Sequence, residues 1–473
     1  MDKTFTAFKQ DFYSRIKDFS LFDSGELNLL KVVLDGLKVD YVSKGKIRIF
    51  ILQPFFVINL FSFFNRIRMF FGMSDRPVKK DFVAELRKTA KRKFLIIDPG
   101  GRTVKTANGI VSFYFGEILK TIGRENAVII AEGRKKDIPE HDLRVSDYNV
   151  FLFSSCGSLK KEDKEQLRIL RSAYSRITAT GIFSPSEMEN ILVAFQQFFI
   201  QYVFWKNLLN AIQPDKVLLW PHYHREGCIA ALQENKIRVI ELQHGLIASE
   251  DIFYVLPETV RPFEKKMLFA DEIWVYGQFW KDQLLKGAGY DESRIKTVGY
   301  YPVTLKPSEE TKAAYREIFP EKKIILITTQ TFMHDYFCAY IKYLSHDLIS
   351  RNAEYGILVK LHPAEAVEKY STISNLGNVK IVNENLDVLF TVAHLHVSVF
   401  STTLFDALRF NVPNFSFWVE QFSDYIALFR EEKISRVIQA NENPLDFMET
   451  VDRNNSAAYY YEEFKASLLT EVR

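Results

Sequence analysis

The sequence predicts an α/β protein with two doubly wound parallel sheets behind a helical N-terminal region. From about residue 94 onward, short apolar runs alternate with amphipathic helical stretches. Each run is apolar throughout instead of alternating with polar residues, which is typical of parallel strands covered by helices on both faces. One segment, 298–311, breaks the series with Gly, Pro, Ser and charged residues, a composition typical of a linker. We therefore expect two successive domains of comparable size.

Composition limits the classes of protein that the chain can belong to. Its 473 residues are 47% hydrophobic and 26% charged, as in a soluble globular protein of two or three domains. A net charge of +3, from 62 basic and 59 acidic residues, is too even for a nucleic-acid binder that relies on a basic field. Three widely spaced cysteines (Cys156, Cys228, Cys338) exclude a disulfide framework and a CxxC metal site.

The N-terminal region, 1–90, is predicted to be helical because apolar residues recur at three-and-four spacing between Leu27 and Leu37. Its polar start lacks the layout of a secretory signal, which predicts a cytoplasmic location. The segment 49–64, rich in Phe and flanked by Arg48 and Arg66, is too short for a spanning helix. Two alternatives remain open. The segment is either a buried helix or helix pair, or an interfacial element that holds the protein peripherally on the inner face of the membrane.

The first Rossmann-like domain is predicted at 91–303 and the second at 304–455, followed by a C-terminal helix within 456–473. In the first domain the expected strands are 94–98, 127–131, 149–153, 216–220, 238–242 and 272–276. In the second they are 323–329, 356–361, 379–382, 395–400 and 414–417. A long helix is expected from Ser184 to Ile212, capped by its opening Ser-Pro-Ser-Glu. The carboxyl ends of two such sheets form clefts that bind nucleotides, although neither GxGxxG nor GxxxxGK[ST] is present.

His244, in Gln243-His244-Gly245, comes directly after the strand 238–242 and is our candidate general base. An imidazole at a strand's carboxyl end, beside a glycine that allows a sharp turn, is placed to take a proton from a sugar or polyol hydroxyl. Carboxylates after two other strands, Glu132 and Asp98, are further candidates for the catalytic site. The pair His222 and His224 also follows a strand, but no carboxylate is spaced to complete a metal site, so no metal and no cofactor is predicted.

Three segments of the second domain are candidates for binding the donor phosphate. In Lys360-Leu361-His362-Pro363 the proline ends a strand and leaves the imidazole as a donor to an anion. Ser401, Thr402 and Thr403 precede a predicted helix, where hydroxyls and free backbone amides form an anion site. Gln330 and Thr331 follow the domain's first strand and Glu384 its third, where they are expected to line the donor pocket. For each motif alone, a capping or turn-forming role is at least as common.

The combination of these motifs resembles the GT-B glycosyltransferases of bacterial surface polysaccharide synthesis. It is similar to the sialyltransferase and Kdo-transferase group, with its His-Pro and Ser-Ser/Thr motifs, and to the CDP-glycerol glycerophosphotransferases. The resemblance spans roughly residues 215–420. It implies His244 as base, and His362, Ser401 and Thr402 as ligands of the donor phosphate. No Asp/Glu-x-Gly segment matches the usual sialyltransferase base, so the identity of the base stays open.

The resemblance implies an enzyme of capsule or lipopolysaccharide biosynthesis. Its partners would be a nucleotide-sugar donor, with a CMP-activated sugar acid such as Kdo or a sialic-acid-like sugar as the best guess, and a glycan or lipid-linked acceptor. Three alternatives remain: a CDP-alditol (glycerol or ribitol) phosphotransferase, a nucleotide-sugar 2-epimerase, or a non-catalytic membrane-associated scaffold.

Overall fold

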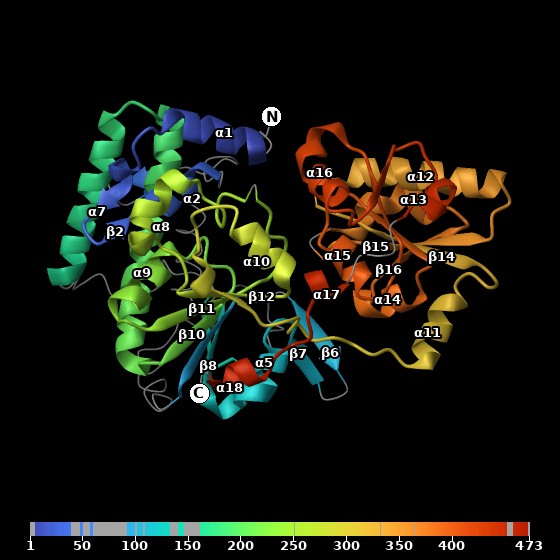
Figure 1. Ribbon diagram of the computed structural model, residues 1–473, viewed down its shortest axis with the longest axis horizontal. Coiled ribbons are helices and arrows are strands. Elements are labelled where there is room, and N and C mark those ends of the chain that lie inside the picture. The colour runs from blue at the N-terminus through green and yellow to red at the C-terminus, as the bar shows by residue number, and fades with distance from the viewer. Residues whose placement is uncertain are drawn as a thin grey trace. The chain divides into compact units, whose positions relative to one another are not determined.

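The computed structural model describes residues 5–38, 48–50, 57–59, 92–99, 102–106, 109–132, 141–145, 161–249, 251–331, 333–363, 365–451 and 457–471. The chain divides into two compact units. The N-terminal unit contains Ala7–Tyr276, Trp280–Pro302 and Phe464–Arg473, and the C-terminal unit contains mainly Val303–Glu463. Each unit is built around one parallel sheet, so the prediction of two doubly wound α/β domains is confirmed (Figure 1).

The N-terminal unit holds a seven-stranded sheet of order β13-β12-β11-β10-β5-β8-β9, in which every neighbouring pair is parallel. The strands are β5 (Phe94–Asp98), β8 (Ala127–Glu132), β9 (Leu143–Val145), β10 (Lys216–Leu219), β11 (Arg238–Leu242), β12 (Glu272–Val275) and β13 (Ile295–Thr297). The chain builds β8 and β9 on one side of β5 and then returns to place β10 on the other side. The sheet therefore reverses its winding between β5 and β10, where Ile97 pairs with Leu219.

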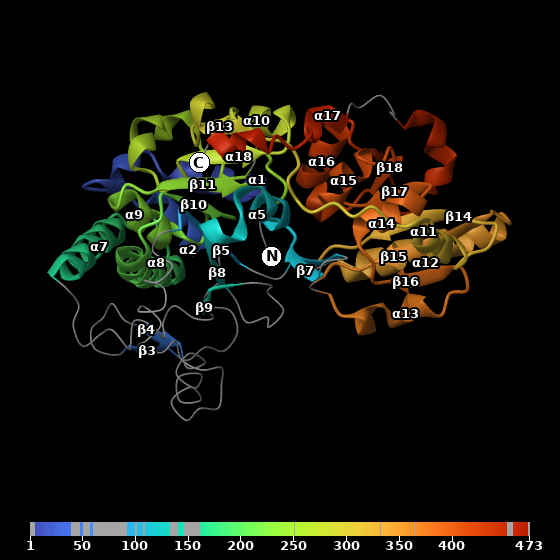
Figure 2. The ribbon, with the colours of Figure 1, turned by 90° about the horizontal axis from the view of Figure 1, so that it is seen from below.

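The described helices of the N-terminal unit are α1 (Phe5–Arg15, from Ala7 onward), α2 (Leu30–Lys38), α5 (Gly116–Ile122), α7 (Lys161–Ala179), α8 (Pro185–Ile212), α9 (Glu226–Glu234) and α18 (Ser467–Glu471). The long helix α8 begins where the sequence predicts, at a capping box in which Ser184 and Glu187 bond each other's backbone amides. Eighteen of its 28 residues are buried because α2, α7 and α9 all pack against it (Figure 2). α18 packs against α5, which brings the end of the chain back to this unit.

The C-terminal unit holds a six-stranded parallel sheet of order β16-β15-β14-β17-β18-β19. Its strands are β14 (Lys323–Thr328), β15 (Tyr355–Lys360), β16 (Val379–Val382), β17 (Leu395–Ser398), β18 (Asn414–Phe417) and β19 (Arg436–Ile438). Its helices are α11 (Glu309–Arg316), α12 (His334–Ser350), α13 (Ser371–Ser374), α14 (Leu386–Val392), α15 (Thr403–Leu408), α16 (Ser423–Glu431) and α17 (Ala457–Tyr460), while α10 (Gln278–Leu284) contains residues of both units. This sheet reverses its winding between β14 and β17.

The continuous apolar runs of the C-terminal sheet are explained by its two-sided core. Ile325 and Ile327 of β14 belong to a cluster with buried residues of α12. Their neighbours Ile324 and Leu326 face a second cluster with Leu389 of α14. Successive side chains of a strand point to opposite faces, so a strand covered on both sides needs apolar residues at every position.

Several predictions of local structure are wrong or fall elsewhere. Within 49–64 the expected helix is contradicted by β3 (Arg48–Phe50) and β4 (Val57–Asn59), which pair antiparallel, while the rest of that segment lies outside the described residues. The C-terminal tail forms the two short helices α17 and α18 instead of one. The predicted strand 149–153 also lies outside the described residues. Two antiparallel pairs, β1 (Asp23–Ser24) with β2 (Leu27–Asn28) and β6 (Thr103–Thr106) with β7 (Gly109–Ser112), were not predicted.

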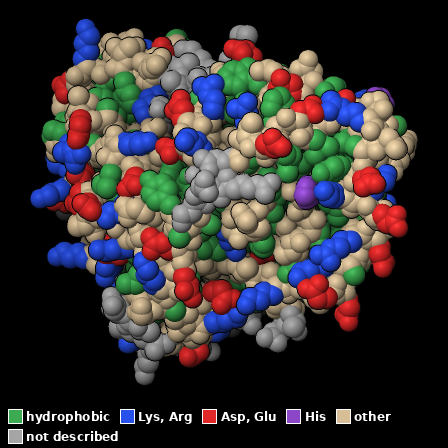
Figure 3. Space-filling model, turned by 45° about the vertical axis from the view of Figure 1, so that its right-hand side comes forward, with side chains coloured by type: hydrophobic (Ala, Val, Ile, Leu, Met, Phe, Trp, Pro, Cys, Tyr) green, Lys and Arg blue, Asp and Glu red, His purple; other side chains and the backbone are tan. Residues whose placement is uncertain are grey.

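The surface carries both signs of charge. On the face seen in Figure 3, basic and acidic side chains are interspersed instead of gathering into one basic field. Of the helices in the described ranges, none is both long enough and apolar enough to cross a bilayer.

Candidate functional site

In each unit, some of the predicted site residues lie near the point where the sheet reverses its winding. In the C-terminal unit, Gln330 follows β14 and Ser401 follows β17, the two strands that flank the reversal. In the N-terminal unit, Asp98 ends β5 and His244 follows β11, beside β10. Open α/β sheets bind their ligands outside the carboxyl ends of the strands at this point of reversal. Both clusters are therefore positioned as binding sites.

A chain of hydrogen bonds fixes the end of β14 against the start of α15. The buried imidazole of His396 lies between Asn414, 2.8 Å from its Nδ1, and Thr328, 2.9 Å from its Nε2. The Oγ1 atom of Thr328 in turn lies 2.7 Å from that of Thr403. The amide nitrogen of Asn414 donates to the carbonyl of Leu404, so its oxygen is the atom that faces His396.

The direction of every bond in this chain follows from that assignment. Because the Asn414 oxygen can only accept, Nδ1 of His396 carries the proton and Nε2 is an acceptor. The Thr328 hydroxyl must then donate to Nε2, and the Thr403 hydroxyl must donate to Thr328. Burial lowers the pKa of His396 to about 4, so the ring is neutral, as this arrangement requires. The hydroxyl proton of Thr403 is thus bonded to Thr328 and is not available to a ligand.

Ser401 and Thr402 lie half-buried beside Thr403. The hydroxyl of Ser401 accepts a bond from the backbone amide of Thr403, which leaves its own proton available. Gln330 is also fixed, because its side-chain oxygen accepts from the backbone amide of Phe400. The structure therefore joins Gln330, at the end of β14, to the segment after β17 that carries Ser401 and Thr402. α15 is only six residues long, so the hydroxyls of Ser401 and Thr402, which precede it, are more important here than the helix dipole.

The loop that carries His362 is held next to the end of β14 by hydrogen bonds of Thr329, Glu365 and Tyr370. None of these three residues was predicted from the sequence. Thr329 accepts a bond from the backbone amide of His362 at 2.9 Å and donates its hydroxyl to the Glu365 carboxylate. Tyr370 donates to the other oxygen of Glu365 at 2.8 Å. His362 itself is half-buried, and Pro363 is exposed. A carboxylate three residues after a histidine in a turn gave the only available signal for Glu365.

The remaining predicted donor residues lie further from the point of reversal. Nζ of Lys360, at the end of β15, donates to Asn383 at 2.9 Å. Glu384 follows β16, the edge strand, and accepts from the hydroxyl of Tyr315 and the backbone amide of Asn385. Thr331 is half-buried beyond Gln330.

His244 in the N-terminal unit is held by aromatic residues. Its Nε2 lies 2.9 Å from the hydroxyl of Tyr223, and its ring stacks on Trp220 with the centroids 5.3 Å apart. Tyr114 packs against the ring of Trp220, and its hydroxyl donates to the backbone carbonyl of His244. Burial lowers the pKa of His244 to about 4, against the opposite influence of Glu241. The imidazole is therefore neutral but a weaker base than the sequence analysis assumed.

Two buried nitrogen atoms of this aromatic cluster, Nδ1 of His244 and Nε1 of Trp220, have no hydrogen-bond partner among the residues that the structure describes. Buried polar atoms of this kind are rare in native structures and call for an explanation. Both lie at the carboxyl ends of neighbouring strands. An acceptor would satisfy Nε1 of Trp220, and it would also satisfy Nδ1 of His244 in the tautomer in which the Tyr223 hydroxyl donates to Nε2.

The carboxylates expected near His244 are already engaged. Glu132 forms a buried ion pair with Arg225, whose Nε donates at 2.8 Å. Asp98, also buried, accepts from the Ser112 hydroxyl at 2.7 Å. These contacts give both residues a structural role, whatever part they take in chemistry.

His222 and His224 turn to different partners. The fully buried ring of His222 contacts Glu241 through Nδ1, and Tyr254 donates to the same carboxylate at 2.6 Å. The exposed ring of His224 contacts Asp35 of α2. The two imidazoles therefore do not face one ligand. Within the part of the chain that the structure describes, no group of His, Cys, Asp and Glu side chains could hold a metal ion.

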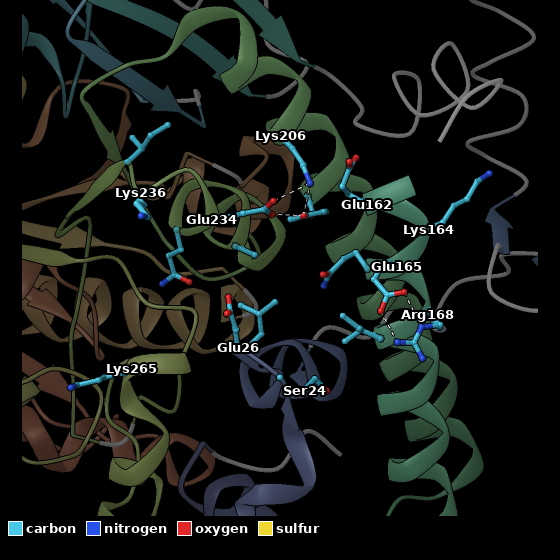
Figure 4. Close-up of a pocket in the computed structure, with 18 of the residues that line it drawn as sticks. Ser24, Glu26, Glu162, Lys164, Glu165, Arg168, Lys206, Glu234, Lys236 and Lys265 are labelled. Atoms are coloured by element: carbon cyan, nitrogen blue, oxygen red, sulfur yellow. Dashed lines mark hydrogen bonds and ion pairs between the residues drawn. The ribbon is translucent and has the colours of Figure 1, made fainter. Parts of the chain in front are cut away.

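A separate hollow of about 1580 Å³ lies near the amino ends of β11 and β12, away from all these residues (Figure 4). Its walls come from α7, α8, α9 and the turn between β1 and β2. They mix basic and acidic side chains, several of which pair with one another, as Lys206 does with Glu234. None of the predicted site residues lines it.

Comparisons with known proteins agree with the architecture. Neither the protein-family models nor the curated proteins give a match to the sequence. Among solved structures, a putative UDP-N-acetylglucosamine 2-epimerase from Listeria monocytogenes is similar at a TM-score of 0.50 and 14% identity, over 80% of this chain and 95% of that one. UDP-GlcNAc 2-epimerase from Methanocaldococcus jannaschii, in complex with UDP-GlcNAc and UDP, gives 0.49 and 13%, over 80% and 98%. The calicheamicin glycosyltransferase CalG4 gives 0.45 and 13%, over 81% and 98%. At these identities the likeness extends to the fold, and the chain has a GT-B fold.

Proposed function

We propose that the chain is a nucleotide-sugar-dependent glycosyltransferase that modifies a surface glycan or glycolipid. The observation that carries this proposal is the position of Gln330, Ser401 and Thr402 after the carboxyl ends of β14 and β17, where the C-terminal sheet reverses. Hydroxyl and amide donors beside a fixed hydrogen-bond chain suit the phosphate of a nucleotide. The Listeria structure of the same fold is described as a putative enzyme of a UDP-sugar, which supports a nucleotide-sugar ligand.

The proposed reaction is a direct displacement. A base takes the proton of the acceptor hydroxyl while its oxygen attacks the anomeric carbon. The bond from that carbon to the phosphate oxygen breaks, and the electron pair leaves with the nucleotide. His362, Ser401 and Thr402 would stabilise the negative charge that develops on the departing phosphate. These side chains would supply the stabilisation without a divalent cation.

The donor best supported by the sequence resemblance is a CMP-activated sugar acid such as Kdo or a sialic-acid-like sugar. The indole Nε1 of Trp220 is compatible with an acidic group, because a carboxylate would accept its hydrogen bond, and Nδ1 of His244 would donate as well when Tyr223 donates to Nε2. The acceptor would be a glycan or a lipid-linked saccharide of capsule or lipopolysaccharide biosynthesis. Such acceptors require the enzyme to reach the inner face of the membrane.

A nucleotide panel tests the proposal. Thermal unfolding of the full chain would be followed with CMP-, CDP- and UDP-sugars and with CDP-glycerol. A ligand at about 100 times its dissociation constant adds about 2.7 kcal/mol to the stability of the state that binds it. A shift with a CMP-sugar, followed by release of CMP when acceptor is added, supports the proposal. A shift and turnover with CDP-glycerol alone would favour alditol phosphate transfer, and no shift with any nucleotide would favour a scaffold.

A 2-epimerase is the second candidate because the Listeria structure of the same fold carries that description. That reaction inverts the carbon that bears the acetamido group and requires a proton to be removed and returned. Glu132 and Asp98 are held by Arg225 and Ser112, which leaves them poorly placed to exchange protons. Incubation with UDP-N-acetylglucosamine in heavy water, without acceptor, separates the two candidates. Deuterium incorporation at that carbon would support the epimerase.

A further inference from the structure

His224 has a geometry that sets it apart from the other histidines of the N-terminal unit. It follows β10, the strand that borders the reversal of the sheet, and its backbone has a φ of 63°. Its side chain is 44% exposed, whereas the carboxylate it contacts, Asp35, is only 6% exposed. An imidazole that is open on one side and anchored to a buried carboxylate on the other is the arrangement that general bases use.

Asp35 is held in place by the packing of α2. At Gly36, the next residue, α2 approaches α8 so closely that an added β-carbon would lie 2.8 Å from Cα of Ile191. One turn earlier, Lys31 is completely buried, donates to the carbonyl of Phe253 and lies over the ring of Phe269. The helix therefore cannot rotate or withdraw without exposing its core face, and the position of the carboxylate is rigid.

This contact fixes the tautomer of His224. Nδ1 faces the carboxylate and donates its proton, so Nε2 carries the lone pair. Nε2 forms no hydrogen bond with any residue in the described part of the chain. His244 differs on each count, because its Nε2 is engaged by Tyr223 and its Nδ1 is buried.

We propose that His224, oriented by Asp35, is the general base of the glycosyl transfer, an inference that rests on the proposed function. Nε2 takes the proton of the acceptor hydroxyl as the oxygen attacks the anomeric carbon. The resulting imidazolium is stabilised by the Asp35 carboxylate and later releases the proton to water. Asp35 is a positioning residue, and His244 is left to bind the acceptor or sugar.

The charges around His224 favour this role. Burial and the charge of Arg225 lower the pKa of His224. The hydrogen bond and charge of Asp35, together with the charge of Glu226, have the larger effect and raise the pKa above its usual value. Lys31, on the same helix as Asp35, also lies close to this cluster, and it is influenced in turn by Glu241 and Asp251. The two histidines therefore shift in opposite directions, and only His224 gains basicity.

The test compares His224→Asn with wild type in the full chain. Asparagine tolerates the left-handed backbone that this position requires, and it cannot act as a base. We expect kcat to fall by roughly 10²–10⁴-fold, the usual worth of general-base catalysis, with donor binding unchanged. His346→Asn, at an exposed position of α12 in the other unit, is the matched control and should keep wild-type turnover.

Asp35→Asn supplies a readout that a merely structural role would not give. Loss of the carboxylate lowers the pKa of His224, so the acidic limb of the kcat/KM profile should move to lower pH while the maximum rate falls. Near-wild-type turnover of His224→Asn, or an unmoved acidic limb in Asp35→Asn, would overturn the assignment of the base and leave the proposed function standing. If wild type binds and turns over no nucleotide sugar, the proposed function fails and the base assignment fails with it.

Discussion

The hydroxyl oxygens of Thr328 and Thr403, 75 positions apart in the chain, lie 2.7 Å apart and join the end of β14 to the start of α15. Because His396 accepts from Thr328, the proton of this bond comes from Thr403. The contact is thus one step in a directed chain that ends at Asn414. It holds the two sides of the sheet reversal together, beside the proposed phosphate ligands Ser401 and Thr402.

The direction of this chain predicts an asymmetry between two isosteric substitutions. Thr328→Val leaves the buried Nε2 of His396 without a donor, which costs about 1–3 kcal/mol of unfolding free energy. Thr403→Val removes one hydrogen bond but leaves Thr328 still donating to His396, at about 0.5–1.5 kcal/mol. Urea unfolding measures both. A larger loss for Thr403→Val would show that the chain runs the other way.

His396 also predicts a dependence of stability on pH. Its pKa is about 4 in the folded state and about 6.5 when unfolded, so acid protonates the unfolded chain first. Its contribution is complete above the unfolded pKa and is lost as pH falls toward 4. Between about pH 7 and about pH 5 the loss is about 2 kcal/mol.

His396→Gln removes this titration and should flatten the acid limb of the stability curve by that amount. Urea unfolding of wild type and variant at the two pH values is the measurement. His346→Gln, at an exposed position, controls for the change of residue type. An equal loss in wild type and His396→Gln would assign the acid sensitivity to other groups.

The architecture could be predicted from the sequence because parallel strands covered on both faces leave a strong signal. β5 and β11 lie at the predicted residues, and β14 within one. The three-residue edge strands β13 and β19 were missed because a run such as Ile295–Thr297 contains too few apolar positions. The N-terminal strands β3 and β4 were missed because an apolar run interrupted by Pro54 fits a helix as well as a hairpin.

The partners within the site could not be predicted, for a physical reason. Lys31 and Asp35 are spaced like a solvated ion pair on a helix surface, yet both are buried. Likewise, nothing in the sequence indicates that Thr329 faces Glu365, because their contact depends on how two separate strand ends meet. Position at a strand end predicted where Ser401 and His362 lie, while side-chain partnership required the folded structure.

His362 predicts a loss of donor affinity. We expect His362→Ala to weaken nucleotide binding by about 10–100-fold, because a charge-assisted bond to the phosphate is lost. Isothermal calorimetry with the nucleotide that stabilises wild type would measure it. Thr329→Val should weaken binding less, since it loosens the loop without removing the ligand. Unchanged affinity in a folded His362→Ala variant would remove this residue from the site.

The Phe-rich segment 49–64 predicts membrane affinity if it is interfacial. Phe55, Phe56 and Phe63 lie outside the described residues, so this rests on the sequence alone. Wild type should co-sediment with anionic vesicles, with each flanking basic residue contributing about 1 kcal/mol, and added salt should weaken the binding. A Phe55→Ser, Phe56→Ser, Phe63→Ser variant should stay folded and in the supernatant. Wild type in the supernatant, with unfolding of the variant, would assign the segment to the core.

Because Glu132 and Arg225 form a buried ion pair, we predict that replacing Glu132 lowers the stability of the fold, whereas the sequence suggested an effect on catalysis. Glu132→Gln leaves the Arg225 guanidinium buried without its counter-charge, which typically costs about 3–5 kcal/mol. We expect a large fall in the urea midpoint, partly recovered when Arg225→Met is added, because the unpaired charge is then removed. If Glu132→Gln stays as stable as wild type but loses turnover, while His224→Asn and His244→Ala retain it, the carboxylate is the base.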